Sequence, residues 1–146
     1  MKKLFAMLLL GAATFSAKAA LFVNSNAGCR VTLVFYAHDA ANTTTCSYYS
    51  TRLEVYPGNS FAYNNVTNMN SPGLGWYRWG FGAQTLVAAN SGWDGVMIYS
   101  DYAPTTTIGA PGSCGASTSF SSTGTPCDIS ATWTALGGGN VLLEIN

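Results

Sequence analysis

The stretch that decides the fold class is Arg30-Val31-Thr32-Leu33-Val34-Phe35-Tyr36, in which every second side chain is strongly apolar. Val31, Leu33 and Phe35 share one face, because successive side chains of a strand point to opposite sides of a sheet. The other face is mixed in character. A repeat with a period of two predicts a β-strand that buries one face.

The same alternation recurs on both sides of this stretch. Residues 52–56 and 60–63 flank Pro57-Gly58, a pair that fits the centre of a type II turn. We therefore predict a β-hairpin over residues 52–63. Further strands are expected at 21–23, 76–82, 85–88, 95–100, 128–134 and 140–145. Loops are expected in the turn-rich segments 64–75, 90–95, 104–115 and 137–139.

Helix signals are nearly absent after the first residues of the chain, since Ser, Thr, Asn and Gly stand where helix formers would be needed. About eight short strands at these spacings predict an all-β fold, an antiparallel β-sandwich of jelly-roll or Greek-key type. A β-barrel is the alternative. The length fits a single domain over residues 20–146.

The first 19 residues have the three parts of a secretory signal peptide. They are a basic start (Met1-Lys2-Lys3), an apolar run (Leu4 to Gly11) and a small-x-small cleavage site (Ala17-Lys18-Ala19). This short signal is of bacterial type. The apolar run is too short for a transmembrane segment, which needs about 20 residues. The sequence predicts a cleaved signal peptide and a secreted or cell-surface protein.

The chain has four cysteines, all after the predicted signal: Cys29, Cys46, Cys114 and Cys127. An even number in a secreted chain favours two disulfides. Three pairings are possible. We expect Cys29–Cys46 and Cys114–Cys127, because these pairings close the shortest loops.

Charge is scarce in the predicted mature chain. All three lysines lie in the signal, so three arginines face six acidic residues, a net charge of −3 (3 − 6). The absence of a basic patch argues against nucleic-acid binding. The absence of lysine excludes P-loop and Schiff-base chemistry. The charged residues are 9 of 127 (146 − 19), far below the usual quarter.

No catalytic constellation stands out, and we predict no enzyme and no cofactor. His38 is the only histidine, and its neighbour Asp39 would point to the opposite face of a strand. No spacing selects a pair of carboxylates for glycoside hydrolysis among Glu54, Asp94 and Glu144. A small secreted hydrolase is the remaining catalytic hypothesis.

Metal binding lacks ligands, because one histidine and bridged cysteines cannot build a zinc site. We predict no metal centre. The candidates for a structural Ca²⁺ are Asp94, Asp101 and Asp128, which lie in turn-rich stretches, but no twelve-residue calcium loop is present.

Aromatic residues are abundant, and the densest cluster is Trp76-Tyr77-Arg78-Trp79-Gly80-Phe81. On a strand, one face of this cluster packs in the core and the other is exposed. Exposed rings stack on sugars, which predicts a lectin-like module. The candidate ligand-binding residues are Trp76, Tyr77, Trp79, Trp93 and Tyr102.

The leading functional hypothesis is a self-associating structural, fibre or surface subunit. Few charges leave sheet edges without their usual protection against pairing. Strand-edge pairing between copies would use the two ends of the mature chain. The residues proposed for it are Leu21, Phe22, Val23, Val141, Leu143 and Ile145. The partner in this hypothesis is the protein itself, and the lectin-like module that binds glycans is the alternative.

Overall fold

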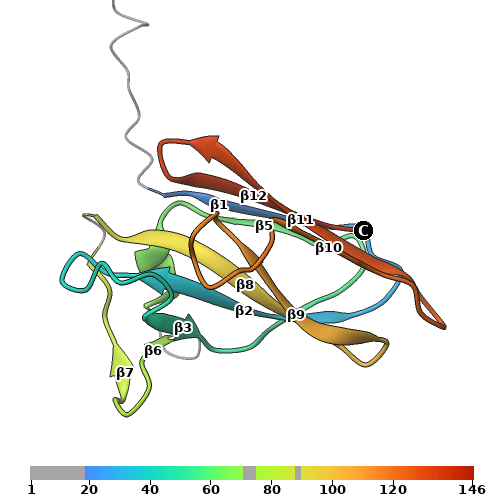
Figure 1. Ribbon diagram of the computed structural model, residues 1–146, viewed down its shortest axis with the longest axis horizontal. Coiled ribbons are helices and arrows are strands. Elements are labelled where there is room, and N and C mark those ends of the chain that lie inside the picture. The colour runs from blue at the N-terminus through green and yellow to red at the C-terminus, as the bar shows by residue number, and fades with distance from the viewer. Residues whose placement is uncertain (1–18, 71–74, 88–89) are drawn as a thin grey trace, which may run out of the picture.

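The computed structural model describes residues 19–70, 75–87 and 90–146. Two β-sheets face each other as the layers of a sandwich (Figure 1). The predicted all-β sandwich is confirmed. The described residues form twelve strands, more than the sequence predicted, because several of them have only two to four residues.

The first sheet, here called sheet A, has five strands. In spatial order these are β10 (Ser119–Ser122), β11 (Ile129–Gly137), β12 (Asn140–Ile145), β1 (Leu21–Ser25) and β5 (Ser60–Tyr63). Its pairs are antiparallel except β1 with β12, which run parallel with Val23 opposite Leu143. The antiparallel prediction therefore holds for every pair but this one.

The second sheet, here called sheet B, has seven strands. Six follow one another in space as β7 (Ala83–Gln84), β6 (Trp76–Tyr77), β3 (Tyr48–Ser50), β2 (Val31–His38), β8 (Gly92–Ser100) and β9 (Ala103–Gly109). The seventh, β4 (Leu53–Val55), also pairs with β2. A short 3₁₀ helix, η1 (Val66–Met69), interrupts the predicted loop 64–75.

The core lies between the sheets and confirms the buried face predicted for residues 30–36. Val31, Leu33 and Phe35 are fully buried. The centre of the core is aromatic, with Trp93 packed against Phe35 and Trp76 at ring-centroid distances of 5.8 and 5.6 Å. Both indoles donate hydrogen bonds to backbone carbonyls, Trp76 to Val66 and Trp93 to Ala19. These buried donors are thus satisfied, as burial requires.

The predicted hairpin over residues 52–63 is wrong, although its turn forms. Asn59 N–H donates to the carbonyl of Tyr56 (3.1 Å), and Gly58 has a φ of 79°. The two flanking strands join different sheets, since β4 pairs with β2 and β5 pairs with β1. Two backbone hydrogen bonds hold this crossover against the end of β1: Gly58 N–H donates to the carbonyl of Ser25, and Ser25 N–H donates to the carbonyl of Asn59. A turn signal determines where the chain reverses, but not which strand each arm pairs with.

Other predicted boundaries also need correction. The expected loop 104–115 contains most of β9, and the expected loop 90–95 contains the start of β8. The expected strand 76–82 is only two residues long before the chain turns, and residues 85–87 form no strand. Residue 88 lies outside the described residues. The predicted strands at the C-terminal end are confirmed in β11 and β12.

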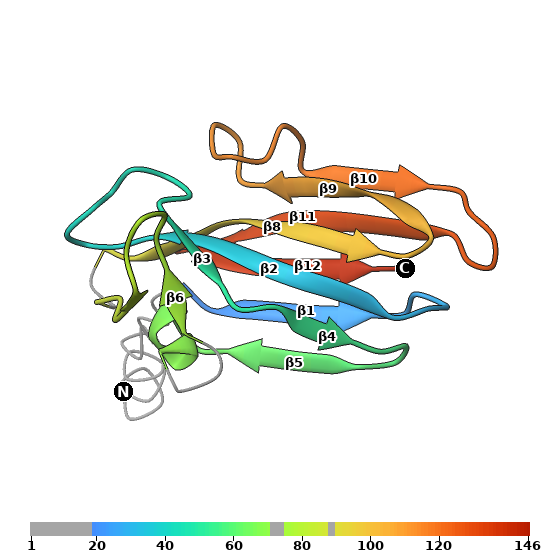
Figure 2. The same cartoon turned by 90° about the horizontal axis from the view of Figure 1, so that it is seen from below.

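The predicted disulfide pairing is wrong. The bridges are Cys29–Cys127 and Cys46–Cys114, with Cα–Cα distances of 6.2 and 5.8 Å. They join loops at opposite ends of the sandwich, the β1–β2 loop to the β10–β11 loop and the β2–β3 loop to the β9–β10 loop (Figure 2). Strand pairing brings these loops together, whereas proximity in sequence does not. Two disulfides fit an extracellular protein.

The strands proposed for assembly are not free edges. In sheet A, β1 lies between β12 and β5, and β12 lies between β11 and β1. Their backbone groups are therefore paired within the chain on both sides, so these strands cannot accept a strand of another copy in this fold. That part of the self-association hypothesis is wrong.

The predicted signal peptide, apart from Ala19, lies outside the described residues. Ala19 itself is buried, and its carbonyl accepts the hydrogen bond of Trp93. In the described part of the chain, no helix is long and apolar enough to cross a membrane.

Candidate functional site

The candidate site lies on the outer face of sheet B, where alternate residues of β2, β3, β6 and β8 point away from the core. Strand register places these residues side by side: Tyr36 opposite Tyr49, Tyr49 opposite Tyr77, Val34 opposite Met97, and Thr32 opposite Tyr99. Cross-strand neighbours on one face lie close enough for large side chains to touch. The result is a row of tyrosines that crosses three strands of the sheet.

One hollow follows this row of tyrosines. It has a volume of about 500 Å³, and half of its ten lining residues are aromatic: Tyr36, Tyr49, Tyr77, Trp79 and Tyr99. Tyr49 contacts both Tyr77 (centroids 5.9 Å apart, planes at 28°) and Trp79 (5.9 Å, 44°). Trp79 is 85% exposed, the largest value among the large apolar side chains that the structure describes as exposed. We call Tyr49, Tyr77 and Trp79 the aromatic platform.

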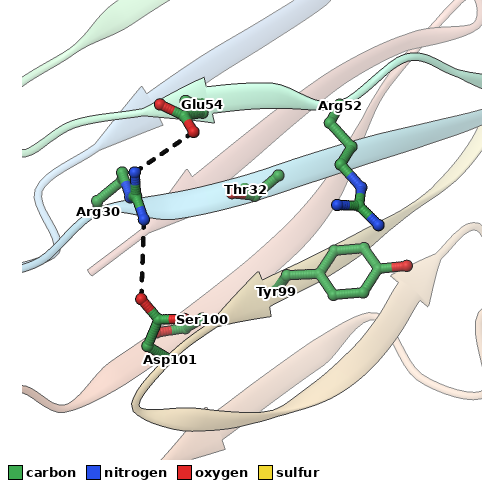
Figure 3. Close-up of a pocket in the computed structure, with 7 residues that line it drawn as sticks. All are labelled: Arg30, Thr32, Arg52, Glu54, Tyr99, Ser100 and Asp101. Atoms are coloured by element: carbon green, nitrogen blue, oxygen red, sulfur yellow. Dashed lines mark hydrogen bonds and ion pairs between the residues drawn. The ribbon is translucent and has the colours of Figure 1, made fainter.

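A second hollow, of about 360 Å³, adjoins the first and is polar. Figure 3 shows Arg30 between two carboxylates, with Glu54 at 3.3 Å and Asp101 at 3.7 Å. The Tyr56 hydroxyl also donates to Glu54, at 3.0 Å. The nearby carboxylate of Glu54 raises the pKa of the Arg30 guanidinium. Both ion pairs are exposed to water, so they contribute little to folding stability.

Arg52 and Tyr99 line both hollows, which makes them parts of one groove along the sheet. The guanidinium carbon of Arg52 lies 5.6 Å from the centre of the Tyr99 ring, and Figure 3 shows the two side chains lying together. This distance is within the range of a cation–π contact. The groove therefore has an aromatic end, a polar end and an arginine between them.

The structure separates the five aromatic residues that the sequence singled out. Tyr77 and Trp79 belong to the platform, whereas Trp76 and Trp93 are core residues with exposed fractions of 0% and 5%. Buried rings cannot stack on a ligand, so their proposal as binding residues is wrong. Tyr102 is exposed but lies in the β8–β9 turn and does not line the groove.

Sequence reasoning missed Tyr36, Tyr49, Tyr99 and Arg52. Their signal was weak because the three tyrosines stand on different strands, β2, β3 and β8, and Arg52 lies between β3 and β4, so that no local cluster forms in the sequence. The available signal was the mixed outer face of residues 32–36, which carries Tyr36 where a solvent-facing strand usually has smaller polar residues. Only the register of β2 with β3 and β8 shows that these residues share a surface.

The structure pairs His38 with a different acid from the one beside it in the sequence. His38 Nδ1 lies 2.7 Å from Asp94 Oδ1, and the other oxygen of Asp94 accepts the backbone N–H of Cys46 at 2.6 Å. Asp39 instead accepts the backbone N–H of Val87 and the hydroxyl of Ser91. Within the described ranges, no hydroxyl or thiol is hydrogen-bonded to the His38 ring. The His38–Asp94 pair therefore links β2 to β8, and Asp94 also links β8 to the β2–β3 loop that carries Cys46.

The three calcium candidates lie in three different surroundings. Asp94 is buried and bound to His38, Asp101 pairs with Arg30, and Asp128 accepts the backbone N–H of Gly124 at 3.0 Å. In the ranges that the structure covers, no three side chains of His, Cys, Asp or Glu gather as a metal site. The fold therefore does not bring the candidate ligands together.

Comparison with models of protein families, with curated protein sequences and with solved structures gave no match. An aromatic surface with a few polar groups at one end suits a ligand that is itself apolar on one face and polar at its rim. Carbohydrates have this character, because a pyranose ring presents C–H groups on its face and hydroxyls at its edge.

Proposed function

We propose that this protein is a secreted, non-enzymatic carbohydrate-binding protein, and that the groove on the outer face of sheet B is its ligand site. The observation that carries the proposal is the aromatic platform, in which Trp79 is almost fully exposed beside two half-buried tyrosines. The predicted signal peptide and the two disulfides support an extracellular location.

The most exposed ring of the platform contributes little to folding. Burial of an aromatic ring stabilises a fold only when the ring leaves water, and Trp79 remains 85% exposed. Grouped exposed apolar side chains on a soluble protein mark interaction sites more often than single ones do. Tyr and Trp suit such sites because their rings are apolar while their hydroxyl and N–H groups can hydrogen-bond.

Hydrogen-bonding groups stand where a stacked sugar would need them. The groove lining adds Thr32, Ser100 and the hydroxyls of Tyr36 and Tyr99 to the platform. These neutral donors and acceptors match sugar hydroxyls without a large cost of removing charge from water. The surface thus combines stacking with hydrogen bonding within one groove.

Self-association through the chain ends is not retained as the primary function, since β1 and β12 are paired on both sides. The scarcity of charge that prompted it fits a glycan-binding surface equally well, because stacking on the platform requires no charged residues.

The test uses the purified protein with both disulfides formed and a broad panel of glycans. Three of the four tryptophans are buried: Trp76, Trp93 and Trp133, with exposed fractions of 0%, 5% and 3%. Ligand-induced changes in tryptophan emission therefore report mainly on Trp79. We expect a bound glycan to shift this emission, and Trp79→Ala to weaken binding at least tenfold, equivalent to about 1.4 kcal/mol.

The matched control is Tyr102→Ala, which removes an exposed ring outside the groove. It should bind the glycan as the unmodified protein does, and both variants should keep the same unfolding midpoint. The proposal fails if no glycan on the panel binds, or if Trp79→Ala binds as well as Tyr102→Ala does.

A further inference from the structure

We infer that the groove selects anionic sugars, and that Arg52 binds their carboxylate or sulfate group. This inference rests on the proposed carbohydrate-binding function and names the class of sugar. It follows from how the four charged residues of the groove are arranged, from the position of Arg52, and from the hydrogen-bonding groups that Arg52 leaves unused.

The charges of the groove are not evenly compensated. Both carboxylates in the lining contact Arg30, Glu54 at 3.3 Å and Asp101 at 3.7 Å. Arg30 is therefore neutralised within the protein. For Arg52, no carboxylate of the described residues lies within the 4.0 Å of an ion pair. The groove thus contains one compensated and one uncompensated arginine.

Arg52 is also held in a suitable orientation. Its guanidinium packs over the face of Tyr99, with the carbon 5.6 Å from the ring centre, which restricts the motion of a long side chain. A guanidinium has five N–H donors in a planar fork that matches a carboxylate or sulfate. In the part of the chain that the structure describes, these donors make no hydrogen bond to a protein acceptor.

The position of Arg52 links it to the platform. It is the one charged residue in the lining of the aromatic hollow, and it lies where that hollow joins the polar one. A sugar ring stacked on Tyr49 and Trp79 would direct a substituent along the groove toward the guanidinium. Charge-assisted bidentate hydrogen bonds are stronger and more directional than those between neutral groups. A sugar acid would use both features, whereas a neutral sugar would use only the platform.

The experiment compares ligands that differ only in charge. The probes are an oligogalacturonate, its methyl ester, which has the same backbone without the carboxylates, and a sulfated galactan oligomer beside its desulfated form. Binding is measured by titration calorimetry with the disulfide-bonded protein. We expect at least one of the two anionic ligands to bind about 10- to 100-fold more tightly than its neutral partner. Whether the carboxylated or the sulfated pair shows this preference identifies the anionic group.

The variants separate a specific contact from general electrostatics. Arg52→Gln should remove the preference for the anionic form. Its control is Arg78→Gln, which removes an equal charge from an arginine that also packs over a ring, Phe81 at 5.1 Å, but outside the groove lining. The control should keep the preference. Arg52→Lys should keep only part of it, because a lysine cannot make the bidentate contact.

Equal affinity for charged and neutral forms, or equal effects of the two glutamine variants, would overturn the role of Arg52. If neutral glycans still bind and Trp79→Ala weakens their binding at least tenfold, the proposed carbohydrate-binding function stands without the role of Arg52. If neither charged nor neutral glycans bind, both proposals fall together.

Discussion

Removing the Cys46–Cys114 bridge is the perturbation whose effect follows most directly from the topology. The 98-residue loop closed by Cys29–Cys127 contains the 68-residue loop closed by Cys46–Cys114. In an unfolded chain that keeps the outer bridge, the inner bridge divides a ring into arms of 68 and 30 residues (98 − 68 = 30). For a flexible chain this division is equivalent to closing one loop of about 21 residues.

Closing a loop of that size removes chain entropy worth about 3 kcal/mol at room temperature. We therefore expect the double variant Cys46→Ala/Cys114→Ala to lower the free energy of unfolding by about 3 kcal/mol. The companion variant Cys29→Ala/Cys127→Ala keeps the inner bridge and loses the loop formed by the 30 residues outside it. It should lower the free energy of unfolding slightly more, by about 3.5 kcal/mol. The assay is urea unfolding followed by tryptophan emission, with the slope of the transition measured for each variant.

The pairing itself has a direct test in the unmodified protein. Trypsin cuts after Arg30, Arg52 and Arg78, which separates the fragments that carry Cys29 and Cys46 from the fragment with the other two cysteines. We expect both small fragments to remain linked to residues 79–146 until a reducing agent is added. A Cys29 fragment linked to the Cys46 fragment, with residues 79–146 released unlinked, would refute the pairing and the stability argument built on it.

Two further predictions concern the core and the sheet. Burial raises the pKa of the Tyr63 hydroxyl, so the phenol loses its proton in the unfolded chain, near pH 10, before it does so in the fold. Stability should therefore fall as the pH rises above about 10, and Tyr63→Phe should reduce that fall in urea midpoints measured across this range. Gly109 pairs with Gly95 across β8 and β9, and a Cβ there would overlap the carbonyl oxygen of Asp94. Gly109→Ala should destabilise the fold by about 1–3 kcal/mol in the same assay. The control Gly82→Ala, which has open space around the new Cβ, should change stability by less than about 0.5 kcal/mol. Equal effects of the two variants would show that the close approach of β8 and β9 does not exclude a side chain at residue 109.

How far the sequence predicted the site depends on whether the residues cluster along the chain. Tyr77 and Trp79 were found because they belong to one local cluster. In the same cluster Trp76 was misplaced, since alternation shows that two faces exist but not which one meets the core. Arg52 and Tyr99 were missed as binding residues because 47 positions (99 − 52) separate them and only sheet pairing brings them together.

The sequence by itself determined the fold class, the buried face of the strand from Val31 to Phe35 and the prediction of two disulfides. These properties depend on local alternation and on counting, which need no knowledge of distant contacts. The tertiary structure alone decided the partners of each strand, the pairing of the cysteines, the association of His38 with Asp94, and the groove. Each of these depends on contacts between residues far apart in the chain, and such contacts are selected by how the two sheets pack rather than by any local preference.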